Sequence, residues 1–362
     1  MTFQSWLSFW TTTQMNSQLN ISDYSVSEIQ YTIFNVCYLV LGVIQFVGNC
    51  LILVALSRSR ELHSKEYYLL AALAVSGLLM GIGGLDAGSR RLYVTWTGQA
   101  SVKATRIYCL MQPFNSCFIL GGLSAPTILL LIACDRLIAC ISVRFYERIN
   151  SICTVTAISI AYGMVIGLYI TAWITSCGLP KIPEVGKLCF TPWVFVDWLV
   201  PVWSWYQLVT STLTIIVFSF AIAYRYGLNS HSLWPKSDQD TGQKQFTVMM
   251  IPVMACAFFL HTVPIWVLLV TVLKVGPTIQ SIVGPICWIL INANSATHLF
   301  VYLKKSQLFR ESIISVLRRG KPELLNTISG AVSERKRRRK SQAAAAVHQL
   351  SVHNFESHLF HN

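Results

Sequence analysis

The stretch IYCLMQPFNSCFILGGLSAPTILLLIAC, residues 107–134, contains no Asp, Glu, Lys or Arg, and Asp135 and Arg136 follow it directly. A helix needs about 20 mostly apolar residues to cross the hydrocarbon core of a bilayer. A charge at mid-membrane costs about 2.5–3.5 kcal/mol even on the lenient insertion scale. A charge-free run of this length is therefore typical of a transmembrane helix, and is hard to explain as a helix in a soluble core.

Six other stretches of the chain also lack these charged residues. With the first, they cover residues 29–57, 67–85, 107–134, 149–180, 198–224, 245–273 and 275–303. Such runs are too long for the strands of a membrane β-barrel and lack their alternating pattern. The sequence therefore predicts an all-α membrane protein, with a bundle of seven transmembrane helices over residues 31–303.

Composition and charge agree with a membrane protein. Only 12% of the residues are charged and 54% are hydrophobic, whereas soluble domains carry about 25% charged residues. The net charge of +13 is spread over short connectors and a C-terminal block, which does not suit a nucleic-acid surface. Most of the 28 Lys and Arg residues lie on one side of the predicted spans. The positive-inside rule then places the N-terminus outside and the tail in the cytoplasm, and we expect the plasma membrane as the location.

The segments outside the spans are short. Residues 1–30 are expected to be extracellular, and Asn20-Ile21-Ser22 is a glycosylation acceptor there. Residues 304–319 place apolar side chains beside basic ones, which predicts a short amphipathic helix on the membrane surface. Residues 320–362 are polar and basic, and we expect a disordered cytoplasmic tail.

Several classes of function are disfavoured by the motifs. The chain has no Walker loop, HExxH, GxSxG or paired intramembrane carboxylates, so we expect no enzyme. The chain contains no CxxC pair, so the sequence indicates neither a metal site nor a cofactor. No internal repeat is visible, which weakens a transporter of two related halves. Cys109, Cys177 and Cys189 lie near the ends of runs, where an oxidising exterior could pair two of them.

The end of the third predicted span carries the most specific motif. Asp135-Arg136 is followed ten residues later by Tyr146. Gly48-Asn49 lies in the first span, Pro264 in the sixth, and Asn294-Ser295 in the seventh. Over roughly residues 30–315 this pattern resembles rhodopsin-like (class A) G-protein-coupled receptors. Its altered motifs look like those of nematode serpentine chemoreceptors such as the Srsx-like group. A boundary charge pair that obeys the positive-inside rule is the structural alternative for Asp135-Arg136.

The resemblance assigns roles to particular residues. Asp135, Arg136 and Tyr146 would couple the receptor to a heterotrimeric G protein, because an opened cytoplasmic face lets the guanidinium reach backbone carbonyls of a partner. The expected activation network consists of Asn49, Phe258, Pro264, Asn294, Ser295, His298 and Tyr302.

The chain also departs from the family pattern. Gly77 stands where most members have a sodium-binding Asp, so we expect no sodium site of the usual kind. Thr262 replaces a Trp of the sixth span, and His298-Leu299 replace Asn-Pro of the seventh. These changes fit either a coupled alteration of the network or a loss of normal switching.

The resemblance implies a disulfide between Cys109 and Cys189, with Cys177 as a competing partner. Candidate ligand-binding residues are Phe118, His261 and Trp266. Phe118 occupies the position of the Asp of amine receptors, which argues against an amine ligand. For His261, a neutral side chain bonded within the bundle is the simpler interpretation. Tryptophans of the outer half could line an apolar pocket, although an interfacial belt explains most of them better.

We therefore expect a chemosensory G-protein-coupled receptor that transmits the binding of an extracellular small molecule or peptide, whose identity the sequence does not give. One alternative is a receptor-like protein that does not couple, such as a trafficking partner or decoy. A small-molecule transporter or channel is the third hypothesis.

Overall fold

The structure is a computed structural model that describes residues 28–58, 65–100, 102–178, 185–194, 199–228, 238–274 and 277–318. Asn20 and the expected tail over residues 320–362 lie outside the described residues. The chain divides into two units, Met1–Arg310 and Glu311–Asn362. The helical bundle described below belongs to the first unit.

Seven helices within the described ranges are long and apolar enough to cross a membrane. They are α2 (Glu28–Arg58), α3 (Lys65–Trp96), α5 (Pro113–Ile141), α7 (Ser151–Cys177), α9 (Leu199–Leu228), the sixth span built from α10 (Asp238–Ala257), η3 (Phe258–Thr262) and α11 (Val263–Lys274), and α12 (Pro277–Lys305). The predicted all-α membrane protein with seven spans is confirmed.

Short elements lie between the spans or after the last one. They are β1 (Lys103–Ala104), α4 (Arg106–Leu110), α6 (Val143–Arg148), β2 (Val185–Gly186), α8 (Thr191–Val194) and α13 (Gln307–Arg318). Strands β1 and β2 pair antiparallel, with Lys103 opposite Gly186. Helix α13 is the short helix expected after the seventh span, and Lys304 and Lys305 of the expected 304–319 segment belong instead to the last turn of α12.

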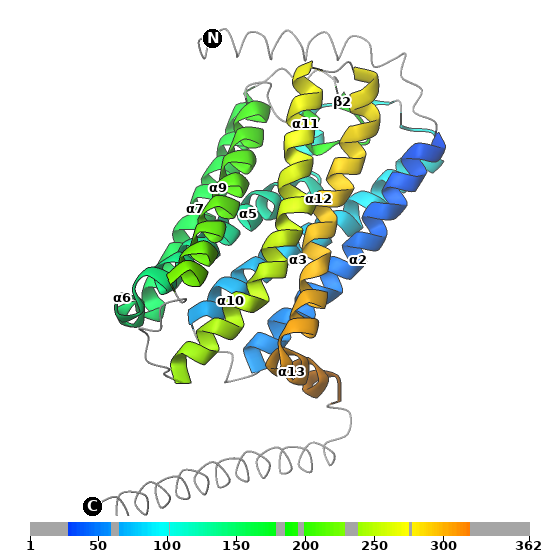
Figure 1. The fold of residues 1–362 in the computed structure, drawn as a ribbon. Helices are drawn as coiled ribbons and strands as arrows, with labels where there is room; N and C mark the ends of the chain where they lie inside the picture. Colours follow the sequence, from blue (N-terminus) through cyan, green and yellow to red (C-terminus); the bar gives the residue numbers. More distant parts are fainter. Residues whose placement is uncertain are drawn as a thin grey trace, which may run out of the picture. The chain divides into compact units, whose positions relative to one another are not determined.

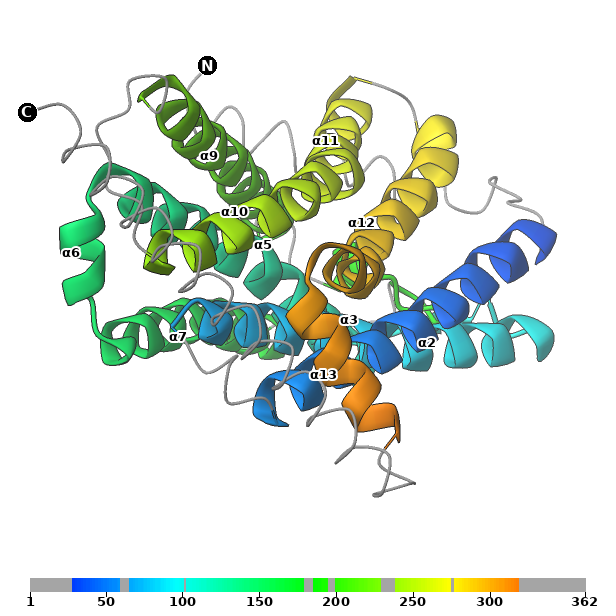
Figure 2. The same cartoon turned by 60° about the horizontal axis from the view of Figure 1, so that its bottom comes forward.

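Helix α5 lies in the middle of the bundle, and Figure 2, which is turned by 60° from Figure 1, shows other spans on several sides of it. In the most apolar 18-residue stretch of α5, 67% of the residues are buried, whereas in that of α7 only 17% are buried. Helix α7 therefore presents most of its surface outward, and Figure 2 shows it at the edge of the bundle. The central position of α5 allows the charged pair at its end to contact several other helices.

Glycines bring α2 and α3 into backbone contact. A Cβ on Gly42 would lie 2.6 Å from the backbone nitrogen of Leu85, and one on Gly81 would lie 2.6 Å from that of Phe46. Small residues permit such close approach between helices in a membrane. The approach fixes how the second half of α3 packs against α2.

The sixth span contains a π-helical turn directly before Pro264. The backbone N–H of Val263 donates to the carbonyl of Phe258, and Pro264 has no N–H to continue the α-helical pattern. A π-turn inserts an extra residue and shifts the direction of the side chains on its two sides. The phenyl ring of Phe258 is 38% exposed, so it faces away from the interior of the bundle.

Candidate functional site

The three expected coupling residues form one hydrogen-bonded cluster. The Nε of Arg136 donates to Oδ2 of Asp135 at 3.0 Å, and its Nη2 donates to the hydroxyl of Tyr146 at 2.8 Å. Ser142 ends α5 and also caps α6, where its side chain accepts from the N–H of Phe145. This tight connection is what returns Tyr146 to the end of α5.

Two charged residues at the start of α3 complete the cluster. The hydroxyl of Tyr146 donates to Oε1 of Glu66 at 3.0 Å, and Nζ of Lys65 lies 3.5 Å from the centre of the Tyr146 ring. Burial raises the pKa of the Tyr146 phenol, so its hydroxyl keeps the proton that it donates. Sequence reasoning missed both residues, although their charges lie beside the second charge-free run on the same side as Arg136.

The guanidinium of Arg136 is completely covered. Its side chain is 0% exposed, and its central carbon lies 4.7 Å from the centre of the Phe246 ring on α10. Tyr67 of α3 meets the Phe246 ring edge-on, at 5.6 Å and 87°. A cation over an aromatic face is stabilised by the quadrupole of the ring. In this arrangement no partner can reach the guanidinium, and a displacement of Phe246 would uncover it.

The expected activation network is only partly brought together. Five of its members lie on α2 and α12, and all five are buried, namely Asn49, Asn294, Ser295, His298 and Tyr302.

The other two network positions lie on the sixth span. Pro264 is buried, but Phe258 is partly exposed and packs against Phe259 with ring centres 5.0 Å apart. The π-turn accounts for this difference, because an expectation from motif spacing assumes a regular α-helix. Phe258 is therefore the network position that the structure separates from the buried members.

Gly77 is tightly enclosed by two members of the network. A Cβ at Gly77 would lie 2.5 Å from Oγ of Ser295 and 2.6 Å from Nδ2 of Asn49. The Asn49 amide also donates to the carbonyl of Gln45 at 2.8 Å. The space that a carboxylate would need at position 77 is thus occupied by neutral side chains. Among the described residues, no group of three or more His, Cys, Asp or Glu could hold a metal ion.

The opposite end of the bundle is held by a disulfide and a buried cation. Cys109 and Cys189 are bonded, whereas Cys177 is free and exposed. Arg91 of α3 donates to the carbonyls of Leu188 at 2.9 Å and Cys189 at 3.2 Å. Asn115 of α5 also donates to the carbonyl of Cys189, at 3.3 Å. These bonds fix the loop before α9 against the ends of α3 and α5.

The three candidate ligand residues do not meet in one cavity. Phe118 and His261 are buried, but Trp266 is 45% exposed. Trp203, for which an interfacial position was one interpretation, is buried and stacks on Trp288 at 5.4 Å and 12°. Trp288 was missed, and it lies in the middle of the seventh charge-free run, residues 275–303.

A small cavity lies beside this stacked pair. It is lined by Ile119, Leu123, Trp203 and neighbouring apolar residues, and it has a volume of about 20 Å³. Such a volume holds roughly one water molecule. This cavity is therefore too small for a larger molecule unless the side chains around it move.

One comparison with known proteins bears on the whole bundle. The family model described as "Serpentine type 7TM GPCR chemoreceptor Srsx" matches residues 40–317. The match covers more than half of the chain and includes Arg136 with its entire cluster.

Proposed function

The chain belongs to the Srsx family of serpentine 7TM GPCR chemoreceptors, and from this membership we propose that it couples an extracellular ligand to a heterotrimeric G protein. Its N-terminus lies outside the plasma membrane and its tail lies in the cytoplasm. The distribution of Lys and Arg along the chain supports this orientation. The ligand is a small molecule or peptide, and the protein is no enzyme.

The observation that carries the proposal is the covered state of Arg136. Its guanidinium is held by Asp135 and Tyr146 and lies under Phe246 of the sixth span. A guanidinium is well suited to bind several carbonyls of a partner once it is uncovered. A ligand that binds the open arrangement more tightly would shift the population toward it.

The ligand enters from the end of the bundle that carries the disulfide. Phe118 and His261 are the buried candidates for contact, and Phe118 belongs to the same hydrophobic cluster as the stacked Trp203 and Trp288. Trp266 remains a candidate only for a ligand that approaches from the lipid side, because its ring is partly exposed. Opening of the bundle between α5, α9 and α12 would create the required space.

Coupling is tested with Arg136→Ala in cells that express the full chain. We expect ligand-independent or ligand-induced G-protein activation in the wild type and its loss in the variant. Arg144→Ala is the matched control, because Arg144 is an exposed arginine on the neighbouring α6. Surface amounts of all three proteins are measured with an antibody to an N-terminal tag, which also tests the orientation.

A second function is favoured by the altered network. Neutral side chains enclose Gly77, and His298-Leu299 leave α12 as a helix without a proline at that turn. A receptor-like protein that does not couple, such as a trafficking partner or decoy, would need no switch there. Identical signals from the wild type and Arg136→Ala, across G-protein subtypes and a broad panel of odorants and peptides, would favour this second function.

A further inference from the structure

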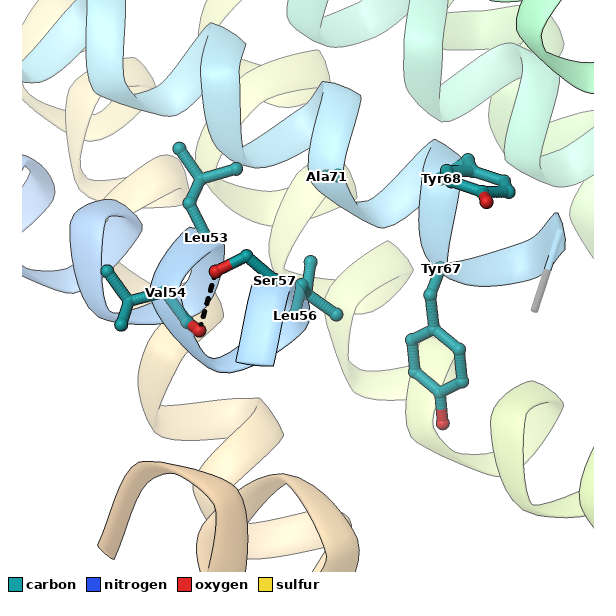
Figure 3. Close-up of a pocket in the computed structure, with 7 residues that line it drawn as sticks. All are labelled: Leu53, Val54, Leu56, Ser57, Tyr67, Tyr68 and Ala71. Carbon is teal, nitrogen blue, oxygen red and sulfur yellow. Dashed lines mark hydrogen bonds between the residues drawn. The ribbon is translucent and has the colours of Figure 1, made fainter. Parts of the chain in front are cut away.

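An open groove lies between α2 and α3 at the end of the bundle that carries Arg136. It has a volume of about 440 Å³, within the range of about 300–1,000 Å³ that is usual for small-molecule sites. Figure 3 shows its lining, with Leu53 and Leu56 on one helix and Tyr67 and Ala71 on the other. The hydroxyl of Ser57 already donates to a backbone carbonyl within α2. The walls are therefore mainly hydrocarbon.

The position of the groove determines which molecules can reach it. Its residues belong to the last turns of the span Ile29–Arg58 and the first turns of the span Lys65–Trp96. Tyr68 at its rim is 41% exposed, so the groove opens at the surface of the bundle. At this depth that surface meets the boundary between headgroups and acyl chains. Membrane lipid is the molecule that can lie in the groove without leaving the bilayer.

The charge beside the groove selects among lipids. Arg58 is exposed and directly follows Ser57 at the end of α2. The nearby Lys65 is occupied, because its amine donates to the carbonyl of Ile149 and lies over the Tyr146 ring. Glu66 points to the Arg136 cluster. Among the described residues at these two helix ends, Arg58 therefore offers an exposed positive charge, which attracts anionic headgroups.

We propose that this groove binds one anionic phospholipid, with an acyl chain between Leu56 and Ala71 and the phosphate at Arg58. Its assignment to the cytoplasmic leaflet rests on the orientation proposed above, whereas the binding itself does not. Tyr67 forms a wall of the groove and meets Phe246, the ring that covers Arg136. The lipid therefore presses on the aromatic pair that keeps the guanidinium covered.

The proposal is tested by native mass spectrometry on the purified full chain. Dioleoyl phosphatidylserine and dioleoyl phosphatidylcholine are titrated separately into the same detergent. We expect one phosphatidylserine to bind more tightly than phosphatidylcholine. Ala71→Phe should weaken its binding about tenfold, because the added ring fills the groove. The matched control is Ala157→Phe, at a half-buried alanine of α7, and it should bind as the wild type does.

A second variant covers the case in which Ala71→Phe does not fold. Arg58→Gln alters only an exposed side chain, and we expect it to weaken phosphatidylserine about fivefold while phosphatidylcholine is unchanged. Equal binding of both lipids by the wild type would overturn the proposal. So would wild-type binding by Ala71→Phe, or a dimer that Ala71→Phe abolishes, which would make a second copy the occupant. No G protein enters this assay, so its result is independent of coupling.

Discussion

Replacement of Phe246 by Leu tests whether an aromatic ring keeps the receptor closed. The ring centre lies 4.7 Å from the guanidinium carbon of Arg136, whose side chain is 0% exposed. A desolvated cation–π contact contributes about 2 kcal/mol, and leucine keeps most of the apolar volume without the π-face. Since about 1.4 kcal/mol corresponds to a factor of ten, the ratio of open to closed receptor should rise about 30-fold.

The size of the signal depends on the resting population. If the open form is about 1% of the receptor, within the usual range for a minor state, a 30-fold rise brings it to about a fifth. The assay is ligand-independent nucleotide exchange on a purified G protein, with receptor amounts matched. Phe246→Tyr keeps the ring and should behave as the wild type. Val248→Leu, at a position of α10 that is 42% exposed, controls for a change of side chain on the same helix.

Two results would refute this reasoning. Equal basal exchange by Phe246→Leu and the wild type, with Arg136→Ala lower than both, would mean that the ring does not limit opening. A rise of the same size in Val248→Leu would mean that any loosening of α10 suffices. In either case the hydrogen bonds of Arg136 to Asp135 and Tyr146, at 3.0 and 2.8 Å, would be the dominant restraint.

Two further predictions concern stability. Gly77→Ala should destabilise the purified receptor by about 1–3 kcal/mol, because its Cβ would lie 2.5 Å from Oγ of Ser295. Gly163→Ala is the control, since its Cβ would meet nothing within 4 Å, and it should leave the melting temperature unchanged or raise it. A lower melting temperature for Gly163→Ala than for Gly77→Ala would contradict the packing argument. Loss of the disulfide in Cys189→Ser should lower the free energy of unfolding by about 2–5 kcal/mol, measured in the same thermal assay. Cys177→Ser is the control and should have no effect. If Cys177→Ser were also destabilised, a different cysteine pairing would be indicated.

The seven spans were predictable because one physical rule governs them. Charged groups are costly in hydrocarbon, so a count of charge-free runs is a count of membrane helices and needs no tertiary information. The Cys109–Cys189 pair followed from the family resemblance, while the positions of the cysteines alone left Cys177 open. The grouping of Asp135, Arg136 and Tyr146 was also expected from the resemblance.

The rest of the site depends on contacts between distant parts of the chain. Glu66 and Phe246 reach the Arg136 cluster from α3 and α10, and no local pattern joins these helices to α5. Phe258 was expected in the activation network from the resemblance alone, and the π-turn at which it lies is not visible in the sequence pattern. The tight enclosure of Gly77 likewise requires knowledge of which side chains face it.

The distribution of helix irregularities indicates where motion would occur. The sixth span contains Pro252, a π-turn and Pro264 in succession, and each of these removes or displaces backbone hydrogen bonds. In the seventh span Leu299 replaces a proline, and α12 continues as an α-helix through it to Lys305. Phe246 lies on α10, before Pro252 in the sequence. A bend of the sixth span at these irregularities would therefore be enough to carry the ring away from Arg136. Loss of the break in the seventh span is therefore compatible with a switch that operates through the sixth.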